Sequence, residues 1–141
     1  MRFLLVAALL AATSVFSQDP GTPDSARAAA LQLLQHLAEG NLEAAAAMSN
    51  APQRRLEVLR AYRDKVGEEE FRRVYARYFA PENRLIAELA IGPRRLLVWE
   101  LGDAGEHISG QVYVESGGKF LLDDVPSRER TELRALLKNY R

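Results

Sequence analysis

The chain has 141 residues, of which 48% are apolar and 27% are charged, and this composition predicts one folded domain with a packed core. Its 19 Lys and Arg are balanced by 19 Asp and Glu, so it lacks the basic excess that a nucleic-acid-binding domain usually carries. The chain contains no Cys, which excludes disulfides, thiol catalysis, Cys-ligated zinc and a lipid anchor on cysteine. We therefore expect a fold held by packing alone, without a nucleic-acid partner.

The first 17 residues have the three-part layout of a secretory signal peptide. Arg2 supplies the positive start, an apolar run covers residues 3–12, and small residues precede Gln18. The apolar run is too short to span a membrane, which takes about 20 residues. We expect cleavage after Ser17, with cleavage after Ser14 as the alternative.

A cleaved signal peptide of this kind predicts an exported bacterial protein, periplasmic or secreted, that keeps no membrane anchor after cleavage. Residues 18–23 contain two Pro and one Gly and are expected to form a linker. The remaining residues, 24–141, are expected to form a single domain.

Apolar residues recur at helical spacing in the first half of this domain. Asp24 or Ser25 is placed to cap the first helix, and Asn41 the second. Gly40 and Gly67 are placed to end helices, because Gly tolerates the left-handed backbone that follows a helix. Helices are expected between Ala26 and Leu37, Leu42 and Met48, Pro52 and Val66, and Glu68 and Phe79.

From Asn83 the apolar period changes to two, which is typical of strands. Turns at 92–93, 102–105 and 116–118 are too short for parallel crossovers and predict an antiparallel meander. A last helix follows Ser127. The expected apolar sets are Leu85, Ala87, Leu89 and Ile91; Leu97, Trp99 and Leu101; Ile108, Val112 and Val114; Phe120 and Leu122; and, in the helix, Leu133, Leu136, Leu137 and Tyr140.

The fold class predicted by this order is α+β: N-terminal helices packed on a curved four-stranded antiparallel meander, with a C-terminal helix. The second strand is apolar on both faces, with Leu96 and Val98 opposite Leu97 and Trp99. Either the sheet curves around an interior, or its second face meets another surface.

Two segments carry a family resemblance. The run 38–45 (AEGNLEAA) looks like the helix–Gly–helix junction that opens many nuclear transport factor 2-like domains, and 112–124 (VYVESGGKFLLDD) resembles their closing strand pair. The resemblance implies membership of the cystatin-like α+β cone superfamily. It implies an apolar cavity between helices and sheet, often a homodimer, and either a small-molecule enzyme or a ligand-binding module.

The candidate pocket lining consists of large side chains on the expected core faces, and His107 is the candidate polar group beside them. No catalytic residue, metal site or cofactor is predicted: His36 and Glu39 have helical spacing, but no second such pair accompanies them. Asp103, Asp123 and Asp124 follow ordinary turn and strand-end patterns. The lining candidates are Tyr75, Tyr78, Leu97, Trp99, Val112 and Phe120.

Ten Arg lie between Arg54 and Arg95, together with seven acidic residues. Pairing of these charges along solvated helix surfaces explains the pattern, and a surface for an anionic partner is the alternative.

Three functions remain in view. The first is a non-catalytic exported domain that binds a small apolar ligand or forms a dimer. The second is an isomerase- or dehydratase-like enzyme on the same scaffold, using His107, an Asp or a Tyr of the cavity. The third is an accessory protein whose exposed sheet face docks an envelope partner. Such docking requires an exposed apolar patch of roughly several hundred Å².

Overall fold

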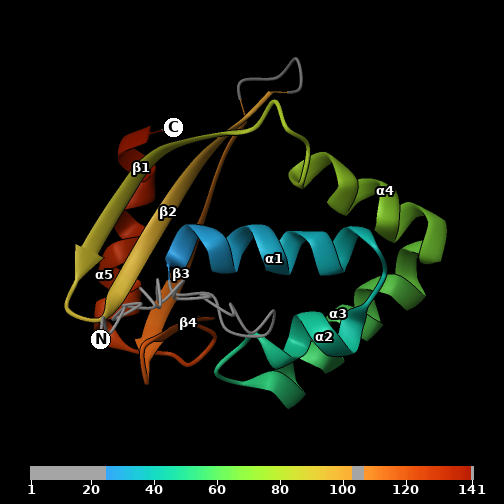
Figure 1. Ribbon diagram of the computed structural model, residues 1–141, viewed down its shortest axis with the longest axis horizontal. Coiled ribbons are helices and arrows are strands. Elements are labelled where there is room, and N and C mark those ends of the chain that lie inside the picture. The colour runs from blue at the N-terminus through green and yellow to red at the C-terminus, as the bar shows by residue number, and fades with distance from the viewer. Residues whose placement is uncertain (1–24, 103–106, 141) are drawn as a thin grey trace, which may run out of the picture.

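The computed structural model describes residues 25–102 and 107–140, and in them four helices precede four strands and a C-terminal helix (Figure 1). This order confirms the α+β class. The expected signal peptide and linker, and Asp103, lie outside the described residues. The elements are α1 (Ala26–Ala38), α2 (Leu42–Ala47), α3 (Pro52–Val66), α4 (Glu68–Tyr78), β1 (Arg84–Ile91), β2 (Arg94–Leu101), β3 (His107–Ser116), β4 (Lys119–Leu122), α5 (Arg128–Leu136) and the 3-10 helix η1 (Leu137–Tyr140).

The helix ends follow from local side-chain chemistry. Ser25 caps α1 by accepting a hydrogen bond from the backbone N–H of Ala28 at 3.1 Å, and Ser127 caps α5 by accepting from that of Arg130 at 3.0 Å. Gly40, at φ 74°, turns the chain between α1 and α2. Asn41 precedes α2 as predicted, but the expected cap is wrong, because its side chain makes no capping hydrogen bond within the described chain.

The four strands form one antiparallel sheet in the order β1-β2-β3-β4, as the short turns predicted. One detail of β1 differs from the expected alternation. Leu85 pairs with Trp99 and Ala87 pairs with Val98, so the register shifts at a bulge between them. A bulge inserts one residue and moves the following side chains to the other face. Leu85 therefore packs in one core, while Ala87 and Leu89 pack in the other.

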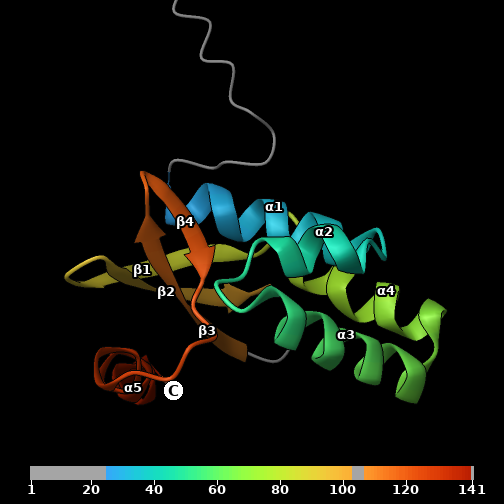
Figure 2. The ribbon, with the colours of Figure 1, turned by 90° about the horizontal axis from the view of Figure 1, so that it is seen from below.

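The sheet has a hydrophobic core on each of its two faces, and this explains why β2 carries apolar residues on both faces. Leu97 and Trp99 pack toward the N-terminal helices. Leu96 and Val98 pack on the opposite face against Leu133, which is fully buried in α5. Figure 2 shows α1 and α5 on opposite sides of the sheet. The second face is thus covered by the chain's own C-terminal helix.

The N-terminal helices do not all lie flat on the sheet. Helix α1 contacts β2, β3 and β4, whereas α3 and α4 pack on α2 and α1 and continue beyond the sheet (Figure 1). Among residues 25–102 and 107–140, no helix has the length and apolar character needed to cross a bilayer. This arrangement leaves hollows between α3, α4 and the exposed part of β3.

Candidate functional site

A cleft of about 450 Å³ lies between α3, α4 and β3, with Leu34 of α1 also in its lining. We call it the tyrosine cleft, because tyrosines from two helices form one of its walls. Its lining residues are Leu34, Arg55, Val58, Leu59, Tyr62, Val74, Tyr75, Tyr78, Ser109, Gly110 and Gln111.

The tyrosine wall is held by aromatic contacts across α3 and α4. The ring of Tyr75 lies 4.8 Å from that of buried Phe71 and 6.0 Å from that of Tyr78. Tyr62 of α3 meets Tyr75 edge-on at 6.3 Å. Such contacts fix the rings, since tilted and edge-on pairs are favoured beyond the burial of their area. The wall is therefore a rigid apolar surface that carries three hydroxyl groups.

The opposite wall is polar where β3 faces the helices. Ser109 and Gln111 alternate along the strand with residues of the other face, so both side chains line the cleft. Gln111 accepts a 3.0 Å hydrogen bond from the hydroxyl of Tyr113, which is fully buried below it. This bond orients the amide and leaves its NH2 group without a partner among the described residues.

Burial and charge act in opposite directions on Tyr75. Burial raises the pKa of its hydroxyl, the charge of Arg55 lowers it, and the neighbouring Tyr62 and Tyr78 raise it, with a net increase. Tyr75 is therefore a neutral hydrogen-bond donor at physiological pH. The influence of Arg55 also shows that a cation lies near this wall.

A second hollow, the tryptophan groove, adjoins the cleft. It has a volume of about 640 Å³ between α1 and the end of α4, and shares Leu34 and Tyr78 with the cleft. Trp99 lines it and is 7% exposed, yet its indole Nε1 has no hydrogen-bond partner among the described residues. This nitrogen is itself buried, so Trp99 adds an apolar ring surface to the groove rather than an accessible donor.

At the other end of the cleft, the loop before α3 is joined to the loop after β4. Asn50 donates to the carboxylate of Asp123 at 2.8 Å and accepts from the backbone N–H of Asp124 at 2.8 Å. Arg94 of β2 donates to Asp123 at 3.1 Å, and the Asp123 side chain is fully buried. We call Ser49, Asn50, Arg55, Asp123 and Asp124 the aspartate junction.

Asp124 is the charged centre of this junction. Its carboxylate accepts a hydrogen bond from the Ser49 hydroxyl at 2.6 Å. It also forms a bidentate ion pair with Nε and Nη2 of Arg55. Burial alone would raise the pKa of Asp124, but the hydrogen bonds from Arg55 and Ser49 and the charges of Arg55 and Arg130 outweigh it and hold the pKa below its usual value. Asp124 is thus ionised in the folded protein.

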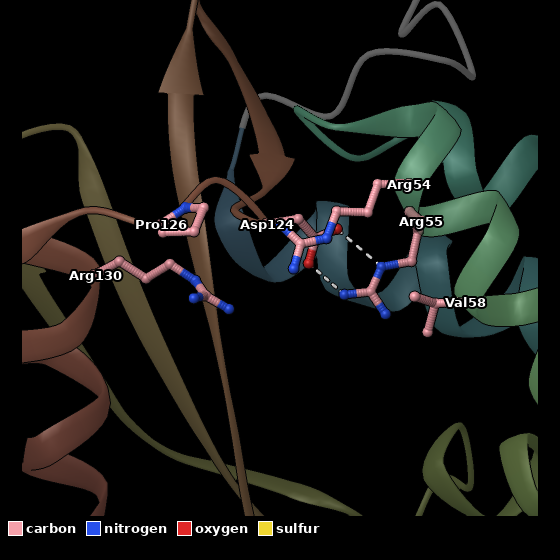
Figure 3. Close-up of a pocket in the computed structure, with 6 residues that line it drawn as sticks. All are labelled: Arg54, Arg55, Val58, Asp124, Pro126 and Arg130. Carbon is pink, nitrogen blue, oxygen red and sulfur yellow. Dashed lines mark hydrogen bonds and ion pairs between the residues drawn. The ribbon is translucent and has the colours of Figure 1, made fainter.

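A third hollow, the arginine pocket, lies beside this ion pair and measures about 170 Å³. Figure 3 shows Arg54 and Arg55 reaching into it from α3, with Arg130 opposite and Asp124 between them. Arg130 donates its Nε to the backbone carbonyl of Asp123 at 2.8 Å. Arg55 also lines the tyrosine cleft, so the two hollows meet at its side chain.

The structure brings together only part of the predicted lining. Tyr75 and Tyr78 line the tyrosine cleft, and Trp99 lines the adjoining groove. Leu97 and Phe120 are buried in the first core instead. Val112 was expected beside them, but it packs on the other face of the sheet, because it alternates with Tyr113 along β3.

The two histidines lie apart from this site. His107, the expected polar group of the pocket, is exposed at the start of β3 and belongs to none of the hollows described above. His36 is half-buried on α1, and its Nδ1 is buried without a partner among the described residues. Within the described ranges, no three His, Asp or Glu side chains gather as metal ligands would.

Sequence reasoning missed Arg55, Tyr62, Ser109 and Gln111 as lining residues. Tyr62 lies within the helix expected between Pro52 and Val66, and Ser109 and Gln111 alternate with the expected apolar residues of β3. The signal that could have found Ser109 and Gln111 is that they share a face of β3 with Tyr113, which is the face that the helices cover. Arg55 was included only in the surface arginines.

Comparisons of the chain with family models, with curated proteins and with solved structures found no match.

Proposed function

We propose that this protein is an exported, non-catalytic binding domain that takes up a small, largely apolar organic molecule in the tyrosine cleft. The observation that carries the proposal is the cleft itself, an apolar hollow with a few converging hydrogen-bond donors. Small-molecule sites have this composition and volumes of about 300–1,000 Å³, and the cleft falls within that range at about 450 Å³.

The lining also suits a ligand with one or two polar atoms. Leu34, Val58 and Leu59 supply apolar contact, and the tyrosine rings supply broad flat surfaces. Ser109 and the free amide of Gln111 are placed to fix the orientation of a bound molecule. A hollow between helices and an antiparallel sheet is also what the resemblance to nuclear transport factor 2-like domains implies, so membership of that superfamily is part of the proposal.

Docking of an envelope protein on an exposed sheet face has less support. That alternative requires an uncovered apolar face, and α5 occupies the second face against Leu96, Val98 and Val112. A homodimer remains compatible with the proposal, and size-exclusion chromatography with light scattering would measure it.

Titration with N-phenyl-naphthylamine, a neutral apolar dye that brightens in apolar sites, tests the binding proposal. We expect saturable binding and a change in the emission of Trp99, the only Trp of the chain, which lines the adjoining groove. Tyr78→Ala should weaken binding about tenfold, because it removes a ring shared by the cleft and the groove. Ser109→Phe, which fills the cleft without removing a core contact, should do the same.

Tyr140→Ala is the matched control, because Tyr140 is a partly exposed tyrosine on η1, outside the hollows described. It should bind the dye like the unsubstituted protein. The proposal would be overturned if Tyr140→Ala weakened dye binding as much as Tyr78→Ala does. It would also be overturned if the unsubstituted protein, shown to be folded by cooperative unfolding, did not bind the dye saturably.

A further inference from the structure

We propose that the ligand of the tyrosine cleft is an amphiphile with one small anionic group, and that the arginine pocket holds this group while the cleft holds the apolar part. This inference rests on the proposed function of the cleft and adds the chemical class of its ligand. It also takes up the alternative role, an anionic partner, that the arginine-rich segment suggested.

The first step is the charge of the arginine pocket. Three guanidinium groups, those of Arg54, Arg55 and Arg130, line it, and Asp124 is the only carboxylate among its described lining residues. Both oxygens of the Asp124 carboxylate already accept hydrogen bonds from Arg55, one from Nε and one from Nη2. The described lining thus carries three positive charges and one negative charge, so the pocket has a net positive charge.

The second step is the state of these two arginines. Arg54 makes no hydrogen bond or ion pair to any residue that the structure describes, although its guanidinium points toward Asp124 and Arg130 (Figure 3). Arg130 is anchored through Nε alone, at 2.8 Å from the carbonyl of Asp123. Its terminal amino groups have no described partner. Two guanidinium groups with free donors face one hollow, which is the arrangement that binds carboxylate or phosphate groups.

The neighbouring arginines of α3 and α4 differ from Arg54. Arg60 pairs with Glu43 at 3.3 Å, Arg72 pairs with Glu68 at 3.1 Å, and Arg73 pairs with Glu70. Paired surface charges of this kind explain most of the arginine-rich segment. Arg54 differs from these residues because it has no described acidic partner and lines the pocket, which it reaches from the first turn of α3 while Arg130 reaches it from the first turn of α5.

The third step is the continuity of the two hollows. Arg55 and Val58 line both the arginine pocket and the tyrosine cleft. Val58 is 52% exposed at this boundary, so an apolar chain that enters the cleft would cover it. A molecule with its anionic end at Arg54 and Arg130 would thus pass Val58 and extend its apolar part toward Tyr75 and Tyr78.

A pair of dyes tests this inference directly. Anilinonaphthalene sulfonate is N-phenyl-naphthylamine with one added sulfonate, so the two differ by the anionic group alone. The unsubstituted protein should bind the sulfonate about tenfold more tightly, and added salt should weaken only the binding of the sulfonate. The variant Arg54→Glu should lower its affinity for the sulfonate about tenfold or more and leave that for the neutral dye unchanged.

Arg60→Glu is the matched control, because Arg60 is on the same helix and is also exposed but lies outside the pocket. Its affinity for the sulfonate should stay within about twofold of the original, since Arg60 does not line the pocket and its guanidinium is paired with Glu43. Arg130→Gln should also lower the affinity for the sulfonate. Urea unfolding checks that this variant is folded. Equal binding of both dyes, or equal effects of Arg54→Glu and Arg60→Glu, would overturn the anionic part and leave the proposed function standing.

Competition distinguishes an amphiphile from a free anion. Decanoate should displace the bound sulfonate, whereas acetate and inorganic phosphate at the same concentration should not. If acetate or phosphate competes as well as decanoate, the pocket is a free-anion site and the amphiphile is wrong. If the neutral dye does not bind, the proposed function itself fails.

Discussion

Asp124 links two loops that lie 74 residues apart in the chain, through Asn50 and its own backbone N–H. Replacing it by Asn keeps the size of the side chain but removes the charge that Arg55 pairs with. We expect Asp124→Asn to lower the free energy of unfolding near pH 7 by about 1–3 kcal/mol, because a partly buried guanidinium loses its counter-ion. Urea titration measures this loss.

The loss should depend on pH in a defined direction. The pKa of Asp124 is lower in the folded protein than its unfolded value of about 3.9, so its charge stabilises the fold above that pH. The stabilisation disappears as the pH falls through the lowered pKa. The difference between the two proteins should therefore be constant from about pH 7 to about pH 5 and shrink below about pH 4. A difference that is unchanged at about pH 3 would contradict this role.

Asp64→Asn supplies the comparison for Asp124. Asp64 is largely exposed, and its ion pair with the adjacent Arg63 is 3.5 Å long. Exposed pairs contribute about 0–1 kcal/mol, so this substitution should have a small effect at every pH.

The residues of the candidate site were only partly predictable, for a physical reason. Tyr75 and Tyr78 could be predicted because their helical spacing placed them on the apolar face of α4. Arg55 could not, because its role depends on Asp124, whose position is set by the path of the chain after β4. Sequence spacing reports neighbours along one element, whereas this ion pair joins two elements that meet only in the fold.

Helix α5 covers the face of the sheet opposite the N-terminal helices. It places Leu133 against Leu96, Val98 and Val112, so an apolar face that would otherwise be exposed becomes a core. Leu133→Ala should lower the free energy of unfolding by about 2–5 kcal/mol, the cost of truncating a fully buried Leu. Leu136→Ala, in the same helix but 36% exposed, should cost about 0.5 kcal/mol or less. Similar losses in both variants would show that α5 is not docked in solution.

The same helix shows where sequence patterns are sufficient and where they stop. The periodicity placed Leu133, Leu136, Leu137 and Tyr140 on one stripe, and the helix does follow Ser127, which caps it. In the structure Leu133 and Leu137 are buried, while Leu136 and Tyr140 are partly exposed. The chain tightens into η1 at Leu137, and this change of helix type redirects the last residues. A bulge in β1 likewise moved Ala87 to the second core, since one inserted residue reverses the alternation.

At the scale of the whole molecule, the three hollows adjoin one another in a row. The tryptophan groove shares Tyr78 with the tyrosine cleft, and the cleft shares Arg55 with the arginine pocket. The cleft between helices and sheet is open because α3 and α4 pack on α2 and α1 rather than on the sheet. Polarity changes across the three hollows from the apolar ring of Trp99 through tyrosine hydroxyls to guanidinium groups. A site of this kind selects a ligand by the distance between its apolar and charged ends as well as by either end alone.

The proposed export signal makes a prediction for the whole chain. The described core begins at Ala26 of α1, which follows the expected linker. Removing the first 17 of the 141 residues therefore should leave a protein of 124 residues, with a formal net charge of −1, that contains every described core residue. After expression in a bacterial host, intact-mass measurement of the protein from the periplasm or medium should give a chain that starts at Gln18. This product should bind N-phenyl-naphthylamine and unfold in one cooperative step. A chain that still starts at Met1 would contradict the export signal, and a mass that matches a start at Val15 would place the cleavage after Ser14.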